Sequence, residues 1–199
     1  MSLRLLDVVP ECYVDTNVVQ TILKMHGANH QKSCSMVLKT IIEKFDGRFA
    51  VGVIDMDKKE PPSLNRFSVI IAKTDELTLR KDPSQNHYII QINHVMETFL
   101  LHCSKDIDLD LQAEGFPHDL EGMKRLTKSR DSDRDPVVSS LVKRLSASAP
   151  MTLLKGTLNY LRLHPYDASE ADLKRMFDTN YNKLLLSGKR KNQELKKGE

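Results

Sequence analysis

The sequence predicts an α/β protein with a mostly parallel central sheet, flanking helices and a helical second half. Residues 48–54, "RFAVGVI", are continuously apolar and rich in β-branched side chains, which is typical of a strand covered on both faces. Strand-like and helix-like segments alternate around it, and this alternation favours parallel strands joined by right-handed crossovers. The chain has 199 residues, of which 40% are hydrophobic, so it can bury one good core.

The elements before the central strand follow from local patterns. Residues 12–14 are predicted as a short strand, and the apolar spacing over 18–23 predicts a helix after it. A loop is expected over 27–33, "GANHQKS", because Gly and Asn interrupt the pattern. The apolar residues between 37 and 45 share one face of a second predicted helix.

After the central strand, the first half continues with further strands. Residues 66–72, "RFSVIIA", are predicted to form another buried strand. Residues 77–92 contain two short strand candidates separated by a turn at Asp82-Pro83. The segment 93–103 then returns to helical spacing.

The second half carries helix patterns only. Asp135 followed by Pro136 is a typical helix start, with the aspartate as N-cap, and it opens a predicted helix over 135–145. Further helices are expected over 149–163 and 169–186. The charged segment 124–135 is predicted to be an exposed loop.

These patterns divide the chain into three parts. We expect an α/β core over 1–102, a helical extension packed on it over 103–186, and a basic, disordered tail over 187–199. The formal net charge is +3, and the tail alone contains five basic and two acidic residues. Because the body is neutral, composition does not by itself indicate a nucleic-acid surface.

Composition also suggests a cytoplasmic location. No apolar run approaches the roughly 20 residues that cross a bilayer, and the N-terminal segment lacks the apolar centre of a signal peptide. The three cysteines, Cys12, Cys34 and Cys103, have no paired spacing, so we interpret them as reduced thiols. No membrane partner is expected.

Three aspartates are the main candidates for a functional site. Asp55 and Asp57 end the central strand, and the strand's period of two places both side chains on one side. Asp15 follows the short predicted strand, and the carboxyl ends of strands form the functional edge of an open α/β sheet. Converging carboxylates favour a bound Mg²⁺ or Mn²⁺. The alternatives are that Asp15 only caps its helix and that D-x-D is a polar turn.

The segments "YVDTNVVQTIL" and "FAVGVIDMD" resemble the TOPRIM domain of topoisomerases, primases and OLD-like nucleases, in which one strand ends in Glu-Gly and a later strand ends in D-x-D. The resemblance covers roughly residues 10 to 102. It implies that Asp55 and Asp57 bind Mg²⁺ and that Asp15 serves as ligand or general acid/base. "INHVMETFLL" is similar to a TOPRIM-like segment in which a glutamate, here Glu97, assists the site.

"YVDTNVV" also resembles the opening of PIN-domain ribonucleases, with Glu43 as the helix acid. Both resemblances imply metal-assisted hydrolysis of phosphodiester bonds in nucleic acid. An interaction or ligand-binding module that kept the fold without the chemistry is the non-enzymatic alternative. The chain has no glycine-rich phosphate loop, although Lys32 at the start of the helix near residue 35 could attract an anion.

Overall fold

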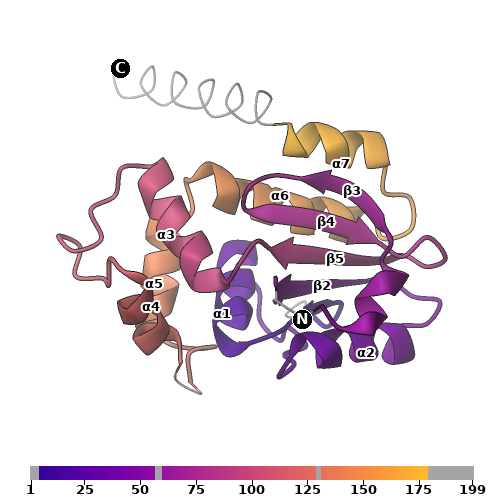
Figure 1. Ribbon diagram of the computed structural model, residues 1–199, viewed down its shortest axis with the longest axis horizontal. Helices are drawn as coiled ribbons and strands as arrows, with labels where there is room; N and C mark the ends of the chain where they lie inside the picture. Colours follow the sequence, from indigo (N-terminus) through magenta and orange to yellow (C-terminus); the bar gives the residue numbers. More distant parts are fainter. Residues whose placement is uncertain (1–4, 57–59, 129–130, 179–199) are drawn as a thin grey trace.

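The computed structural model describes residues 5–56, 60–128 and 131–178, and its architecture is α/β as predicted (Figure 1). The strands of these residues form one five-stranded sheet with the order β1-β2-β5-β4-β3. β1, β2 and β5 are parallel, while β4 and β3 continue the sheet in antiparallel fashion. The strands are β1 (Val8–Pro10), β2 (Ala50–Asp55), β3 (Val69–Lys73), β4 (Leu77–Lys81) and β5 (His87–Ile92).

Seven α-helices and one 3-10 helix surround this sheet in the described part of the chain. They are α1 (Tyr13–Leu23), α2 (Cys34–Lys44), η1 (Pro62–Arg66), α3 (Met96–Asp106), α4 (Leu120–Thr127), α5 (Pro136–Leu145), α6 (Ala149–Leu163) and α7 (Glu170–Phe177). In Figure 1 the arrows of β2 and β5 point toward the side of the molecule where α1, α3, α4 and α5 lie. These four helices therefore stand at the carboxyl ends of the parallel strands, whereas α6 and α7 lie alongside the sheet.

The interior strand β2, which was predicted as the central strand, separates two apolar cores of the described residues. Val51 and Val53 belong to the larger core, which includes residues of α1, α3, α5 and α6, whereas Ala50 and Ile54 pack with α2 on the other face. Side chains alternate along a strand. Asp55 therefore continues the face of Val51 and Val53, on which α1 packs.

The prediction of a strand at 12–14 was wrong, because helix α1 already begins at Tyr13. Cys12 is its N-cap: the sulfur accepts from the N–H of Asp15, and the Asp15 carboxylate accepts from the N–H of Cys12. This reciprocal arrangement is a capping box, and it starts the helix immediately after the turn. The strand of this region is β1, four residues earlier, which was not predicted.

The loop after α1 completes the outer edge of the short strand β1. The N–H groups of Asn29 and Gln31 donate to the carbonyls of Val8 and Pro10, each at 2.9 Å. The predicted loop 27–33 is therefore confirmed. It provides hydrogen-bond donors to carbonyls of the edge strand that could otherwise pair with another chain.

Two other predictions need correction. Residues 66–72 were expected to form a buried strand, but β3 is the edge of the sheet and Ile70 is 54% exposed. Residues 124–135 were expected to be an exposed loop, but 124–127 belong to α4 and Ser132 is fully buried. The predicted turn at Asp82-Pro83 and the helix start at Asp135 are confirmed.

The proposed boundary at 102/103 falls inside α3, and residues on both sides of it contribute to the larger core. In the described residues, no helix has the length and apolar character needed to cross a membrane. The predicted tail over 187–199 lies outside the described residues. Of the three cysteines, Cys12 is partly buried and Cys34 and Cys103 are buried.

Candidate carboxylate site

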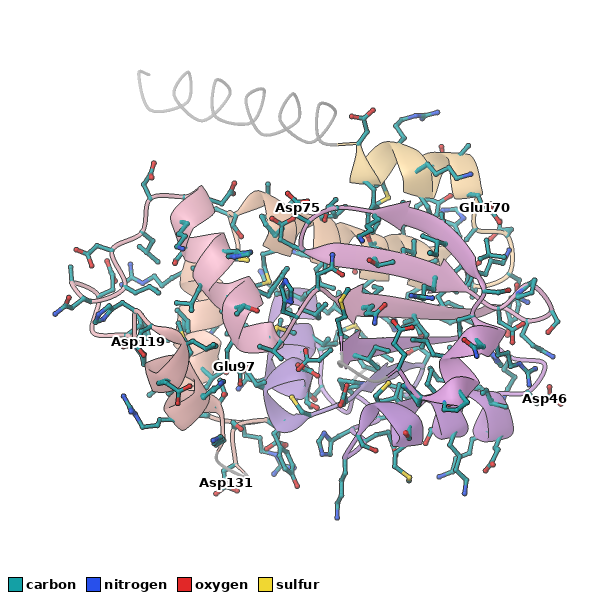
Figure 2. The ribbon with its side chains drawn as sticks, viewed as in Figure 1. Asp46, Asp75, Glu97, Asp119, Asp131 and Glu170 are labelled. Carbon is teal, nitrogen blue, oxygen red and sulfur yellow. The ribbon has the colours of Figure 1, made fainter. Side chains whose placement is uncertain are left out.

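Four carboxylates gather where β1 and β2 end. Glu11 directly follows β1, Asp15 lies in the first turn of α1, Asp55 is the last residue of β2, and Glu97 lies in the first turn of α3. Figure 2 shows Glu97 at the end of α3 nearest to α1. The loop after β1, α1, β2 and α3 thus each contribute one acid.

Hydrogen bonds to main-chain groups hold two of these acids in place. The N–H of Asp55 donates to Glu11 Oε2 at 3.1 Å, which ties the end of β1 to the end of β2. The N–H of Met96, the first residue of α3, donates to Asp55 Oδ1 at 3.0 Å. Asp55 therefore accepts one of the free N–H groups that every helix start presents.

Asp15 is fully buried, and its two oxygens have different surroundings. Oδ2 accepts from the N–H of Cys12 at 3.2 Å, which is its capping role. Oδ1 is buried and has no hydrogen-bond partner among the described residues. An unsatisfied carboxylate oxygen in a protein interior is costly, so this atom needs a proton or a cation nearby.

The fourth acid, Glu97, is held from the helical half. The hydroxyl of Thr127, at the end of α4, donates to Glu97 Oε1 at 2.5 Å. This contact joins the first turn of α3 to α4. It positions Glu97 beside the other acids, and its charge acts on both aspartates.

Burial and mutual repulsion raise the pKa of two acids. The pKa of Asp55 lies well above its usual range because of burial first, and then because of the charges of Asp15, Glu11 and Glu97. Burial also raises the pKa of Asp15, with further contributions from Glu11 and Glu97. Carboxylates that raise one another's pKa in this way share one region of space.

The thiol of Cys12 is unsuited to nucleophilic chemistry. Its burial, together with the charge of Asp15, raises its pKa far above the ordinary value. A thiol that stays protonated is a poor nucleophile and a poor metal ligand. Cys12 therefore acts as the cap of α1, and the chemistry of this region depends on carboxylates.

The structure brings together three of the four predicted site residues, namely Asp15, Asp55 and Glu97. Asp57 lies outside the described residues. Glu11 was missed because the strand was placed at 12–14 rather than 8–10. The signal was present in "VVPE", where an acid directly follows a short apolar stretch.

The donor chemistry of the cluster fits a hard divalent cation. All four side chains offer oxygen atoms, which Mg²⁺ and Mn²⁺ prefer, and Asp15 Oδ1 is a buried acceptor without a partner. Within the described residues, however, no three Asp, Glu, His or Cys side chains are arranged so that they could hold a metal ion. The carboxylate cluster therefore matches a divalent cation in charge and in donor atoms, but its side chains do not form a complete coordination shell.

Two other sequence candidates lie elsewhere or beside the site. Glu43, the helix acid of the PIN resemblance, is exposed on α2, which covers the opposite face of the sheet from α1. Lys32 is exposed near the start of α2 and lines a small pocket together with Glu11.

Comparison of the chain with protein-family models, curated proteins and solved structures found no match.

Proposed function

We propose that this protein is a metal-dependent enzyme that hydrolyses or transfers phosphodiester groups of nucleic acid, using carboxylate-bound Mg²⁺ or Mn²⁺. The observation that supports this most is the convergence of four acids at the carboxyl ends of parallel strands, with a buried, unpartnered oxygen on Asp15. Such convergence costs stability, and proteins commonly retain such costs at functional sites.

The TOPRIM resemblance supports the same proposal with one change of assignment. In that family the first strand of the motif ends in a glutamate. Here β1 is followed by Glu11, so Glu11 takes that position, and Asp15 lies four residues further along on α1. Asp57, two residues after Asp55, remains a predicted ligand.

The proposed roles follow from the contacts. Asp15 and Asp55 would hold the cation, because Asp15 Oδ1 and Asp55 Oδ2 accept no hydrogen bond from another described residue. Glu11 orients Asp55 through its main-chain N–H. Glu97 is partly exposed beside them and can accept or return a proton. When bound, the cation supplies the positive charge that stabilises a phosphodiester under attack.

A non-enzymatic interaction module is the second candidate, and two observations favour it. Asp15 caps its own helix through Cys12, as a purely structural aspartate would. The described residues also contain no group of three metal-ligating side chains in a suitable arrangement. In that case the acids would serve only to connect β1, β2, α1 and α3.

Thermal unfolding with EDTA and with Mn²⁺ separates these two candidates. A ligand that binds only the folded state stabilises it by about 2.7 kcal/mol at a hundred times its Kd. In a chain of this size that corresponds to a rise of about 5 to 10 °C in Tm. Asp55→Asn should abolish the rise and any Mn²⁺-dependent cleavage of an oligonucleotide.

Asp75→Asn is the matched control, because Asp75 is exposed in the turn between β3 and β4, away from the acids. It should keep both the Tm rise and the cleavage. The metal site is refuted if Mn²⁺ leaves the Tm of the parent protein unchanged. A Tm rise without cleavage would instead favour a metal-binding module.

A further inference from the structure

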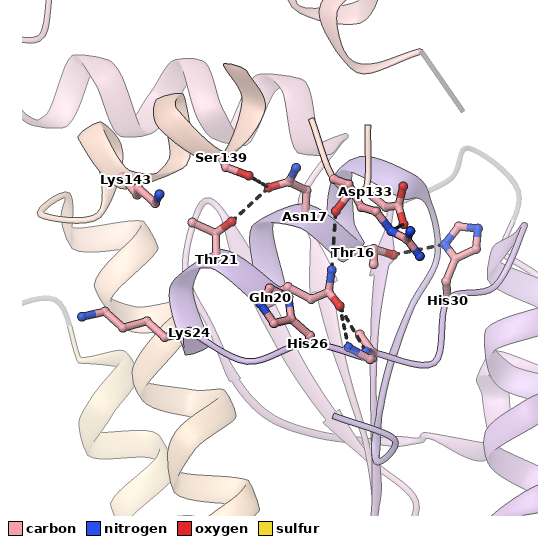
Figure 3. A pocket seen from close by; sticks show the side chains of 13 residues that line it. Thr16, Asn17, Gln20, Thr21, Lys24, His26, His30, Asp133, Ser139 and Lys143 are labelled. Atoms are coloured by element: carbon pink, nitrogen blue, oxygen red, sulfur yellow. Dashed lines mark hydrogen bonds and ion pairs between the residues drawn. The ribbon is translucent and has the colours of Figure 1, made fainter. Parts of the chain in front are cut away.

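A large pocket, lined mostly by residues with polar side chains, lies between α1, the loop that follows it, and the start of α5 (Figure 3). Its volume is about 900 Å³. Pockets of roughly 300 to 1,000 Å³ are the size that holds a small organic ligand or one nucleotide unit. Thr16, Asn17, Gln20, Thr21 and Lys24 line it from α1, and the other lining residues are His26, Gly27, Ala28, His30, Asp133, Arg134, Ser139 and Lys143.

The back of the pocket is built rigidly around Asn17. Its side-chain nitrogen donates to the carbonyls of Ser132 and Asp135, at 2.7 and 3.1 Å. Its side-chain oxygen accepts from the hydroxyls of Thr21 and Ser139, at 3.0 and 2.9 Å. Because all these polar atoms are satisfied by one another, the wall keeps its shape without a ligand.

The charge of the pocket is positive. Lys24 and Lys143 are exposed, and neither forms an ion pair with another described residue. Figure 3 shows both at the same end of the pocket. Arg134 is paired with Asp133 at 3.4 Å, so these two largely cancel. The two lysines are thus available to an anionic group.

The pocket borders a second, smaller one that Glu11 of the carboxylate site lines. Thr16 follows Asp15 on α1, so this helix contributes directly to the large pocket and to the carboxylate site. His30 lines the large pocket and also the smaller one of about 380 Å³, whose other lining residues include Glu11 and Lys32. A chain-like ligand could therefore reach from Lys143 to Glu11 along one surface.

An aromatic pair stands where the two pockets meet. The rings of Tyr13 and His30 are stacked, with centroids 4.2 Å apart and an interplanar angle of 20°. The Thr16 hydroxyl donates to the Cys12 carbonyl at 2.8 Å and lies 3.1 Å from His30 Nδ1. These contacts hold the His30 ring in place. Tyr13 is partly exposed, so its flat ring is accessible to a ligand.

We propose that this pocket binds the phosphate backbone of single-stranded nucleic acid, with Lys24 and Lys143 contacting phosphates and the Tyr13–His30 pair offering a surface for a neighbouring base. The proposal deepens the function given above and rests on it for the cleavage step. It identifies the substrate as a single strand that runs past the carboxylates.

A single strand fits better than a duplex for reasons of shape. Cationic grooves with interspersed aromatic side chains are the usual way to bind unpaired strands, because a base can stack on a ring only when it is unpaired. A hollow between two helices can admit one nucleotide, whereas a duplex presents its phosphates on a wide convex surface. Lys24 and Lys143 line such a hollow.

The experiment measures binding of a short fluorescein-labelled single-stranded oligonucleotide, as DNA and as RNA, at several salt concentrations in EDTA. Lys24→Gln combined with Lys143→Gln should weaken binding about tenfold. It should also lower the slope of log affinity against log salt by about 0.7 for each lysine, the value expected for a contact to a single strand. DNA and RNA have the same phosphate chemistry, so comparing the two oligonucleotides shows which nucleic acid the pocket binds more tightly.

Lys39→Gln is the matched control, since Lys39 is an exposed residue of α2 on the opposite side of the sheet. It should leave affinity and salt slope unchanged. The inference is overturned if the double variant binds as the parent does, or if Lys39→Gln causes an equal loss. It is also overturned if duplex DNA depends on the two lysines as strongly, or if inorganic phosphate competes as well as the oligonucleotide.

Failure of this inference differs from failure of the proposed function. The double lysine variant should retain the Mn²⁺-induced rise in Tm, because neither lysine belongs to the carboxylate cluster. A protein that responds to Mn²⁺ but binds single strands independently of the lysines keeps its metal site and loses only this pocket assignment. A protein that binds single strands through the lysines but ignores Mn²⁺ is a binding module rather than an enzyme.

Discussion

The side-chain amide of Asn17 in α1 donates a 2.7 Å hydrogen bond to the carbonyl of Ser132, 115 residues later in the chain. Both residues are fully buried. The same nitrogen also donates to the carbonyl of Asp135, the N-cap of α5. One side chain of the α/β half thus fixes the segment of the helical half that leads into α5.

Replacing Asn17 by alanine should therefore destabilise the protein strongly. Two carbonyls and two hydroxyls lose a partner, and each buried polar group left unsatisfied costs about 1 to 3 kcal/mol, partly recovered by relaxation. We expect Asn17→Ala to lower the free energy of unfolding by about 2 to 4 kcal/mol in urea denaturation. Thr21→Val removes only one of these hydrogen bonds, so a cost equal to that of Asn17→Ala would contradict the central role of Asn17.

Gly52 in β2 allows α2 to pack closely on the sheet. A Cβ at this position would lie 2.7 Å from Ile89 Cδ1 and 2.9 Å from both Ile41 Cδ1 and Val37 Cγ1. All three are buried core side chains, so little room exists for adjustment. Gly52→Ala should cost about 1 to 3 kcal/mol, as overpacking usually does.

Gly156 in α6 provides the opposite case for the same substitution. Its added Cβ would meet only the flexible end of Met176, at 3.1 Å. Alanine is favoured over glycine inside a helix by about 0.5 to 1 kcal/mol, so Gly156→Ala should raise the Tm slightly. If both variants changed the Tm in the same direction, close packing around Gly52 would not explain the effect of Gly52→Ala.

The α/β class and most elements could be predicted from the sequence because hydrophobic periodicity is a local property. The strands around Asp82-Pro83 and the helix opened by Asp135 needed no knowledge of distant residues. The strand β1 was missed because it has only three residues and its outer edge is completed by the loop at Asn29 and Gln31. The three-residue sequence of β1 contains no sign that a distant loop will provide its backbone hydrogen bonds.

The candidate site was predicted only in part, because some of its acids could be placed from local patterns and others could not. Asp55 follows an unmistakable strand, so its place at the sheet edge could be inferred. Glu11 could not be placed without β1, and Glu97 entered only through a family resemblance. The buried role of Ser132 is a tertiary effect, because a serine in a charged segment carries no local sign of burial.

The turn before β5 contains an aspartate that should be important for stability. Asp82 is 1% exposed and accepts hydrogen bonds from the N–H and hydroxyl of Ser84, at 2.8 and 2.7 Å, and from Arg66 Nε at 2.6 Å. Burial alone would raise its pKa, but the hydrogen bonds from Ser84 and the charge of Arg66 outweigh burial, and the pKa is lowered. The charged form is therefore the stable one in the folded protein.

We expect Asp82→Asn to lower the free energy of unfolding by about 1 to 3 kcal/mol at neutral pH. A lowered pKa contributes stability above the unfolded value of about 4, and this contribution disappears as the pH falls through the folded value. Urea denaturation of both proteins at neutral and acid pH measures the difference. A cost that persists unchanged at the most acid pH would show that the charge of Asp82 is not what matters.

The last prediction concerns the pH dependence of the metal-free protein. Asp15 and Asp55 have raised pKa values in the folded state, so the folded protein binds protons more readily than the unfolded chain does. Their contribution should therefore destabilise the protein at alkaline pH and diminish as the pH falls through the folded pKa values toward about 4. In EDTA, the free energy of unfolding should rise on mild acidification, by at most about 1.4 kcal/mol per pH unit for each proton taken up.

Asp55→Asn isolates this effect, because the asparagine carbonyl can still accept from the N–H of Met96 while the charge is gone. At alkaline pH this variant should be as stable as the parent or more stable, and its stability should vary less with pH. Mn²⁺ should remove the same pH dependence from the parent protein, because a cation neutralises the carboxylates that protons would otherwise neutralise. If Asp55→Asn were instead less stable than the parent at alkaline pH, with the same pH dependence, Asp55 would be a structural anchor for α3 and the repulsion among the four acids would have no measurable effect on folding.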